Sequence, residues 1–441
     1  MRMNRLPTIC TTLLLSAGLA LAGPIAQAND GGTPPDTTDP AVVLNDDNPD
    51  GESSGAEAAA PQDDGPTLDV SINGSLRFNV LFRDYGKPSE GPTINNELQD
   101  GGFTFDTFRI GANGSYGSLI FDAEYAIYPE SFGGLYIHHG WVGYEFSDAR
   151  QVQVGVSQVP FGIQPYASSS WFFNTTYYVG LEDDYDAGIK ALYQANGWDI
   201  QGAYYMNAEQ TTFFAGADAA RYSYDVVPSG GGNLAGSFVA QPRGVSEANQ
   251  FNAKVAYSFD HGDTGFTKVG VSGQRGQLLN RSTGGTDWHA AYAAHFQGRY
   301  AGFEAKLQFA QQELNPPGVN DDSYVVMGAY ASPHEVASEH DVYSSSLAYH
   351  IPVSTGPISE IKPYYDFSAV TNKNVDAWND NVTHDIGFLT SAGPLFIYTD
   401  LNISRGHPFN QPFDTTFPQL FTEQNDNEWR TAFNINIGLY F

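Results

Sequence analysis

The histidines are the residues that could most directly support catalysis. His138 and His139 are adjacent, so on a β-strand one would point inward and the other outward, which suits no shared metal ion. His289 and His295 share a segment, but no partner for either can be identified from the sequence. A catalytic nucleophile needs a base oriented beside it, and neither a G-x-S-x-G nor an H-E-x-x-H motif occurs. The sequence therefore predicts that the protein is not an enzyme.

An acidic tract near the start has the spacing of a cation site. Residues Asp46 to Glu57 match an EF-hand calcium loop, and Gly51 would permit its sharp turn. Ser53 stands where such loops usually carry an apolar residue, Pro49 is awkward within the loop, and no flanking helix pair is visible. This tract could therefore bind calcium or form a solvated linker, and its amino-acid composition favours the linker. We predict no metal and no other cofactor.

Most other charged residues lie in segments where apolar and polar residues alternate. A period of two is typical of a β-strand with one apolar and one wet face. Charges of opposite sign facing each other across a narrow aqueous passage would orient polar solutes. For any single residue, solvation or an ordinary salt bridge is the competing interpretation. The predicted lining residues are Arg77, Arg109, Asp122, Glu124, Lys254, Lys268, Glu304, Lys306, Lys362, Asp366, Asp400 and Arg430.

The last fourteen residues, 428–441, show this alternation clearly. Large side chains such as Trp429 and Phe433 alternate with small or polar ones, and the chain ends on Phe441 in phase with the apolar face. This ending resembles the terminal strand of bacterial outer-membrane barrels. The resemblance implies that Phe441 and its strand are recognised by the barrel-assembly machinery. It also implies that the apolar faces meet outer-membrane lipid and lipopolysaccharide while the polar faces line the lumen.

The composition agrees with a secreted barrel. Aromatic residues make up 14% of the 441 residues and charged residues 16%, and no run of about 20 apolar residues that could form a spanning helix follows the leader. Residues 1–28 resemble a signal peptide that ends in an A-x-A cleavage site. Cys10, the only cysteine, falls within it, so the mature chain would have no disulfide. Residues 29–66 are expected to form an acidic disordered linker. The net charge of −30 argues against nucleic acid as a partner.

The alternation defines seventeen candidate strands over residues 67–441. A barrel with both chain ends on the periplasmic side needs an even number, and sixteen remain if 323–331 belongs to a long outer loop. We therefore predict an all-β, antiparallel up-and-down transmembrane barrel of about sixteen strands. Eighteen is the alternative, if a strand lies within 207–247. Long loops are expected near 84–102, 159–186, 207–247, 276–286 and 404–427.

A long aromatic loop, 160–186, follows the fifth strand. Its position resembles the third loop of porins, which folds into the barrel and narrows it. Its aromatic residues could form a path for sugars or pack the loop onto the wall. The predicted constriction residues are Phe161, Tyr166, Trp171, Phe172, Phe173, Tyr177, Tyr178, Glu182, Asp183 and Asp184.

Two short motifs at the ends of this loop resemble the phosphate-selective porin O and P family. They are 159–162, Val-Pro-Phe-Gly, and 186–189, Asp-Ala-Gly-Ile. The resemblance covers about 67–441 and implies a homotrimer of sixteen-stranded anion channels. The family depends on dense Arg and Lys at the constriction, whereas 160–186 contains neither.

The mixed lining leads us to expect an outer-membrane porin of a Gram-negative bacterium that passes small hydrophilic solutes and ions by diffusion. A phosphate- or anion-selective channel is one alternative. A plugged structural or adhesion barrel, tethered by the linker, is an alternative of another class. Glycines expected on the inner face, Gly155, Gly188 and Gly270, predict room for water in the lumen.

Overall fold

The computed structural model describes residues 65–84, 102–129, 132–172, 174–209, 221–228, 243–410, 419–423 and 425–441. The expected signal peptide, the acidic linker with its Asp46–Glu57 pattern, and Phe173 lie outside the described residues. The described chain is built almost entirely of β-strands joined by turns and loops. No helix within these ranges is long and apolar enough to span a membrane.

The strands follow the alternating segments of the sequence. Their bounds are β1 (Leu68–Asp84), β2 (Phe103–Tyr116), β3 (Leu119–Ile127), β4 (Leu135–Ser147), β5 (Arg150–Gln158), β6 (Tyr185–Ala195), β7 (Trp198–Ala208), β8 (Asp225–Val226), β9 (Val245–Asp260), β10 (Gly265–Asn280), β11 (Thr286–Tyr300), β12 (Phe303–Leu314), β13 (Tyr324–Ala329), β14 (Ser332–Ala337), β15 (Glu339–Tyr349), β16 (Ile351–Thr355), β17 (Ile358–Thr371), β18 (Asn381–Ala392), β19 (Leu395–Arg405) and β20 (Arg430–Tyr440).

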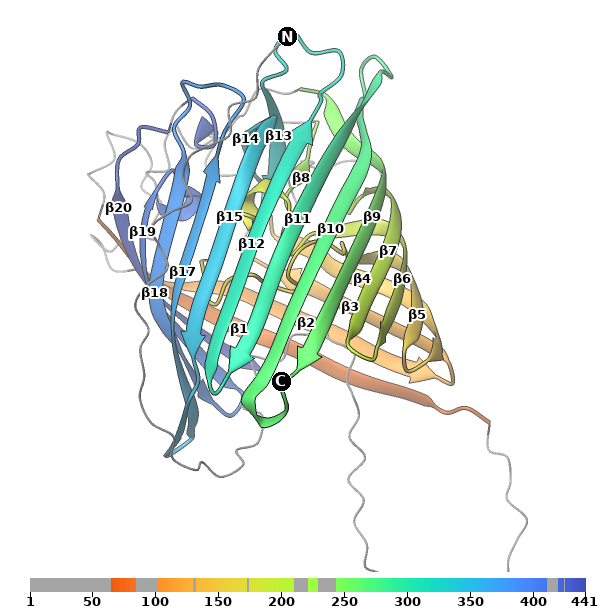
Figure 1. Ribbon diagram of the computed structural model, residues 1–441, viewed down its shortest axis with the longest axis vertical. Coiled ribbons are helices and arrows are strands. Elements are labelled where there is room, and N and C mark those ends of the chain that lie inside the picture. Colours follow the sequence, from red (N-terminus) through yellow and green to blue (C-terminus); the bar gives the residue numbers. More distant parts are fainter. Residues whose placement is uncertain are drawn as a thin grey trace, which may run out of the picture. The chain divides into compact units, whose positions relative to one another are not determined.

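The large sheet closes on itself. Each strand pairs antiparallel with its neighbour along the chain, as β10, β11, β12 and β15 show side by side in Figure 1, and β1 pairs with β20 to complete the ring. The segments β15 and β16 both pair with β17 and are two halves of one strand around His350. The ring therefore has sixteen strands, as predicted, and the alternative of eighteen is wrong. Closure leaves no strand edge with unpaired backbone groups.

The outer face of the ring is apolar. Phe251 is 62% exposed, Val142 64% and Phe303 65%, and each alternates along its strand with residues that point inward. Many further large apolar residues are exposed in the same way on almost every strand. A soluble protein rarely exposes so much contiguous apolar surface, whereas a barrel embedded in lipid must. The predicted orientation, apolar face outward, is confirmed.

The connections alternate between short turns and longer loops. Segment 323–331 was expected to lie in a loop, and β13 indeed lies in the connection between β12 and β15. It forms a separate three-stranded sheet with β14 and β8. One boundary was predicted wrongly: β10 continues to Asn280 and β11 begins at Thr286, so the long loop expected near 276–286 is only the short turn 281–285. Polar residues before this turn continue the strand because their backbone groups stay in the ladder.

The glycines expected to leave room for water do not do so. A Cβ atom on Gly155 would lie 2.3 Å from the carbonyl oxygen of Gly140, and one on Gly188 would lie 2.1 Å from that of Tyr204. At Gly270 it would lie 2.4 Å from His295 Nε2. Neighbouring strands and side chains occupy this space, so the interpretation of these glycines was wrong.

A substitution at Gly188 tests this close approach. We expect Gly188→Ala to reduce the folded fraction, because the added methyl group must push β7 backbone away, at a cost of about 1–3 kcal/mol. Gly202→Ala on the adjacent strand is the matched control, since its nearest atom would be 3.9 Å away. The folded fraction is measured by the mobility of unboiled refolded protein on SDS gels. Equal folding of the two variants would contradict the prediction.

Candidate functional site: the pore constriction

The loop after β5, residues 159–184, crosses the interior of the barrel and meets the far wall. Its backbone N–H groups donate to side chains on strands distant in the ring. Gly162 N donates to Ser272 Oγ on β10 over 2.9 Å, and Ile163 N donates to Gln308 Oε1 on β12 over 2.8 Å. Backbone donors inside a barrel need such partners, because burial without them is costly.

Further along the loop, two aspartates of the far wall hold it in place. Asp366 Oδ2 on β17 accepts the backbone N–H groups of Ser169 and Ser170 over 2.8 and 2.7 Å. Asp400 Oδ2 on β19 accepts that of Trp171 over 3.3 Å. These two predicted lining residues therefore bind the loop. Bonds to a charged acceptor are stronger than neutral ones, so this segment is the most firmly held part of the crossing.

Two predicted lining lysines also contact the loop. Lys306 Nζ on β12 donates to the carbonyl oxygens of Tyr166 and Ser168 over 3.1 and 3.2 Å. Lys254 Nζ on β9 donates to Gln164 Oε1 over 2.7 Å. Residues 164–166 and Trp171 are only half-buried, unlike the rest of the loop. This edge is the part of the loop that a solute in the lumen would meet.

Most of the loop aromatics are buried. Tyr177 and Tyr178 lie in a short 3-10 helix, η2 (Tyr177–Val179), and pack against Tyr224 and Tyr330. Phe161 and Phe172 are likewise almost fully buried, whereas Tyr166 and Trp171 are half-buried. Packing therefore accounts for the buried four, and among the loop aromatics that the structure describes only Tyr166 and Trp171 are placed to contact a solute.

The loop acids do not face the lumen. Glu182 accepts a bond from Asn174 Nδ2 over 2.6 Å, and Asp183 accepts one from the Tyr222 hydroxyl over 2.7 Å. Burial raises the pKa of Glu182 to about 8, although the bond from Asn174 acts in the opposite direction. The third acid, Asp184, is also buried. The carboxyl groups of Glu182 and Asp183 therefore hold the loop together from within.

The wall formed by β1 to β3 carries paired charges. Arg77 Nε lies 3.1 Å from Asp106 Oδ2, and Arg109 Nη1 lies 3.3 Å from Glu124 Oε1. Arg109 also donates to the hydroxyl of Tyr222 over 3.2 Å. Each of the two arginines faces an acid on the neighbouring strand.

The opposite wall, β7 to β12, is paired in the same way. Asp199 Oδ2 lies 2.8 Å from Lys268 Nζ and 3.6 Å from Lys254 Nζ. Lys306 Nζ lies 3.5 Å from Glu304 Oε1. Lys268 is the most exposed of these bases, with 27% of its side chain accessible. Because basic and acidic groups are interleaved, neither wall carries a block of one sign.

The two remaining predicted bases differ in position. Lys362 is buried on β17 and interacts electrostatically with Glu304, Lys306 and Asp366 beside the loop. Arg430, at the start of β20, pairs with Asp426 and Glu428. Its partners belong to the end of the connecting loop, so Arg430 lies at the loop end of the barrel and not beside the constriction.

Asp106 and Asp199 were not predicted as lining residues. Asp106 is the extra residue of a β-bulge, because Arg77 pairs with Thr107 while Phe78 pairs with Phe105. A bulge places one extra residue in the strand, so its side chain can point to the face opposite to the one that simple alternation predicts. The inward position of Asp106 could therefore not be predicted from the sequence pattern. Asp199 lies in regular alternation between the outward residues of β7, and that pattern could have shown it.

A second bulge corrects the interpretation of the histidines. Glu124 pairs with His139 and Tyr125 with Ile137, which leaves His138 as the extra residue. Both histidines are buried inside the barrel, with their Nδ1 atoms 2.9 Å apart. His139 Nε2 lies 3.2 Å from Asp122 Oδ1. The expectation that the two rings point to opposite faces was wrong.

Solved structures with this fold include outer-membrane porins. OmpF of Salmonella typhi, in a complex with daunomycin, has 10% identity and a TM-score of 0.52, over 86% of this chain and 99% of that one. An anion-selective porin from Comamonas acidovorans has 13% identity and a TM-score of 0.49, over 85% and 100%. OmpT of Vibrio cholerae, in its trimer form, has 14% identity and a TM-score of 0.49, over 85% and 99%.

No family model matches the chain, and no curated protein matches it. The similarity to OmpF shows that the fold is that of the outer-membrane porins, as the terminal strand led us to expect. The finer resemblance to the phosphate-selective porins O and P is not confirmed.

Proposed function

We propose that this chain is an outer-membrane porin through which small hydrophilic solutes and ions diffuse with weak charge selectivity. The observation that carries the proposal is the paired lining beside an inward-folded loop. In Arg77–Asp106, Arg109–Glu124 and Lys268–Asp199, each base has an acid within 3.3 Å. Selectivity follows the charge of the lining, and a paired lining presents little net charge to a passing ion.

Two alternatives have their own support. An anion- or phosphate-selective channel would use Lys254, Lys268 and Lys306, which all lie on the wall that meets the loop. A plugged structural or adhesion barrel is favoured by the buried aromatic cluster around Tyr177 and Tyr330, which fills part of the interior. The paired state of the lysines weighs against the first alternative. The half-buried edge at 164–166 weighs against the second.

Conductance distinguishes the three functions. Purified full-length protein is inserted into a planar bilayer, and the reversal potential is measured across a tenfold salt gradient. We expect discrete steps with a reversal potential near zero. A strong anion preference that millimolar phosphate blocks would replace the proposal with the selective channel. The absence of steps from protein shown to be folded would replace it with the plugged barrel.

The cellular setting is part of the same proposal. The apolar outer face supports insertion into outer-membrane lipid and lipopolysaccharide. The backbone N–H of Phe441 donates to Gly74 O over 3.0 Å, and its carbonyl oxygen accepts from Gly74 N over 2.8 Å. These bonds join the terminal residue to β1, and the terminal strand is the segment that the assembly machinery would recognise. A homotrimer rests on the porin resemblance, and the mass of the detergent complex tests it. We propose transport without catalysis.

A further inference from the structure

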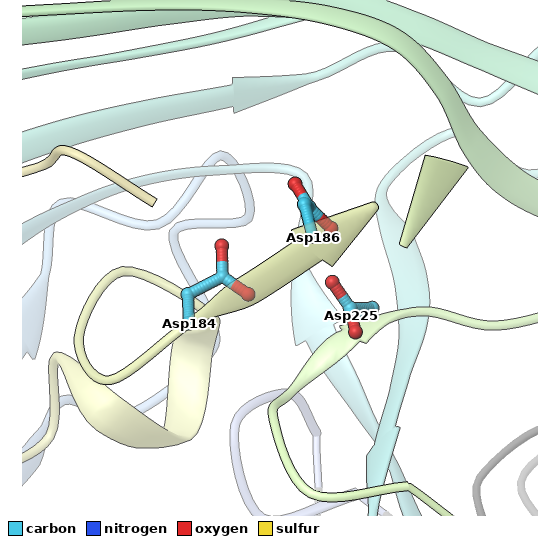
Figure 2. Close-up of side chains that lie close together, drawn as sticks. All are labelled: Asp184, Asp186 and Asp225. Carbon is cyan, nitrogen blue, oxygen red and sulfur yellow. The ribbon is translucent and has the colours of Figure 1, made fainter. Parts of the chain in front are cut away.

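Three aspartates converge at the point where the constriction loop rejoins the wall. Asp184 ends the loop, Asp186 lies on β6, and Asp225 lies on β8, about forty residues further along the chain. One carboxylate oxygen from each lies within 4.8 Å of the other two. Figure 2 shows the three carboxyl groups gathered between the end of the loop and the segment that carries Asp225. All three are buried, at 6%, 1% and 1% exposure.

Some of these oxygens have no hydrogen-bond donor. Oδ1 of Asp184 and Oδ1 of Asp186 are buried without a partner in the described part of the chain. The other oxygen of Asp186 accepts from Gln250 Nε2 over 3.0 Å, and Asp225 Oδ2 accepts from Arg221 Nη1 over 3.1 Å. A buried carboxylate oxygen without a donor is costly. Two carboxylate oxygens without donors in one cluster indicate a ligand that both of them bind.

The excess of negative charge around the three aspartates also indicates a bound cation. Glu209 and Glu247 lie against the same cluster and act electrostatically on Asp184. Arg221 is the basic group that pairs with this cluster, to Asp225 at 3.1 Å and to Glu209 at 4.0 Å. Within the described part of the chain, five carboxyl groups, those of Asp184, Asp186, Glu209, Asp225 and Glu247, therefore lie together with one arginine, Arg221. A cation would neutralise this excess without protons.

The donor set selects the kind of cation. Oxygen ligands alone suit a hard cation and offer nothing to metals that prefer nitrogen or sulfur. Mg²⁺ usually keeps several waters and takes only one or two carboxylates, whereas Ca²⁺ takes six to eight oxygens and accepts several carboxylates in a flexible geometry. Three carboxylate oxygens within 4.8 Å of one another fit Ca²⁺ better.

We propose that Asp184, Asp186 and Asp225 bind one divalent cation, Ca²⁺ by the number of carboxylates offered, which ties the constriction loop to segment 221–228. The site would add an ionic link between elements that already contact one another, through Tyr185 N and Ser223 Oγ over 3.1 Å and through the Tyr222 hydroxyl and Asp183 over 2.7 Å. Bound Ca²⁺ would fix the end of the loop and hence the position of its lumen edge. This site is distinct from the Asp46–Glu57 pattern, and it does not depend on the proposed transport function.

Calcium titration of the full-length protein tests the site. Protein refolded without lipopolysaccharide, which itself binds divalent cations, is stripped with EDTA and titrated calorimetrically with CaCl₂. We expect one site per chain, with a dissociation constant of about 10⁻⁵–10⁻³ M. Asp184→Asn and Asp225→Asn are each expected to weaken binding at least tenfold. Asp385→Asn is the matched control and should leave calcium binding unchanged. It removes another buried carboxylate, which accepts a hydrogen bond from Asn402.

A second measurement needs no variant that might misfold. Tb³⁺ occupies calcium sites and luminesces when excited through nearby tyrosines, and Tyr185 lies between two of the ligands. We expect tyrosine-sensitised emission from the wild type that CaCl₂ displaces and MgCl₂ displaces far less. Absence of calcium binding by the wild type would overturn the proposal. Equal loss of binding in Asp385→Asn and Asp184→Asn would overturn it as well.

Discussion

Replacing Asp366 and Asp400 together by alanine is expected to free the constriction loop and to give channels with larger, rapidly fluctuating conductance. The two carboxylates accept three consecutive backbone N–H groups, those of residues 169–171. A hydrogen bond to a charged group contributes about 1.5–3 kcal/mol, so the variant removes the strongest bonds between the loop and the far wall. Single-channel recording in planar bilayers measures both the mean conductance and the fluctuation.

The controls for this experiment separate loop release from loss of charge. Asp366→Asn removes the charge but keeps an acceptor oxygen, so it is expected to fluctuate less than Asp366→Ala. Asp263→Ala removes an acid from the exposed turn between β9 and β10 and should behave as the wild type. Steady conductance of wild-type size in the double variant would show that Asp366 and Asp400 do not hold the loop.

Reversing the charge of Lys268 is expected to turn a weakly selective channel into a cation-preferring one. Lys268 is the most accessible of the paired bases, and its partner Asp199 keeps Lys254 as a neighbour when Lys268 is replaced. A unit charge about 4 Å from an ion is worth ~1 kcal/mol in water, about fivefold in local concentration. Lys268→Glu changes the lining by two charges, so the permeability ratio should rise several-fold at 0.1 M salt.

Two variables test whether the charge at position 268 causes the change in selectivity: the salt concentration and the position of the reversed charge. The shift should shrink at 1 M salt, where the screening length falls from about 10 to about 3 Å. Lys268→Gln should give roughly half the effect, because it changes one charge instead of two. Arg150→Glu makes the same reversal at the exposed first residue of β5 and should leave the reversal potential unchanged. An equal shift from Arg150→Glu would assign the effect to the overall charge of the protein.

Alternation along single strands determined the class of fold and much of the lining. Arg77, Arg109, Lys254 and Lys268 were identified because a period of two assigns each residue to one face, whatever the rest of the chain does. The even strand count followed from placing both chain ends on the periplasmic side. The loop between β5 and β6 was located because its composition breaks the alternation. These are local properties, or properties of any closed barrel, and the sequence carries them directly.

Only the tertiary structure decided which side chains meet. Asp106 and His138 point inward because bulges in β2 and β4 shift the register by one residue, and a bulge depends on the partner strand. The loop acids were expected at the constriction but are buried, since the loop folds back on itself and bonds with Asn174 and Tyr222. Asp225 reaches Asp184 and Asp186 through a loop packed inside the ring. Such contacts join residues far apart in the chain, and alternation along one strand holds no information about them.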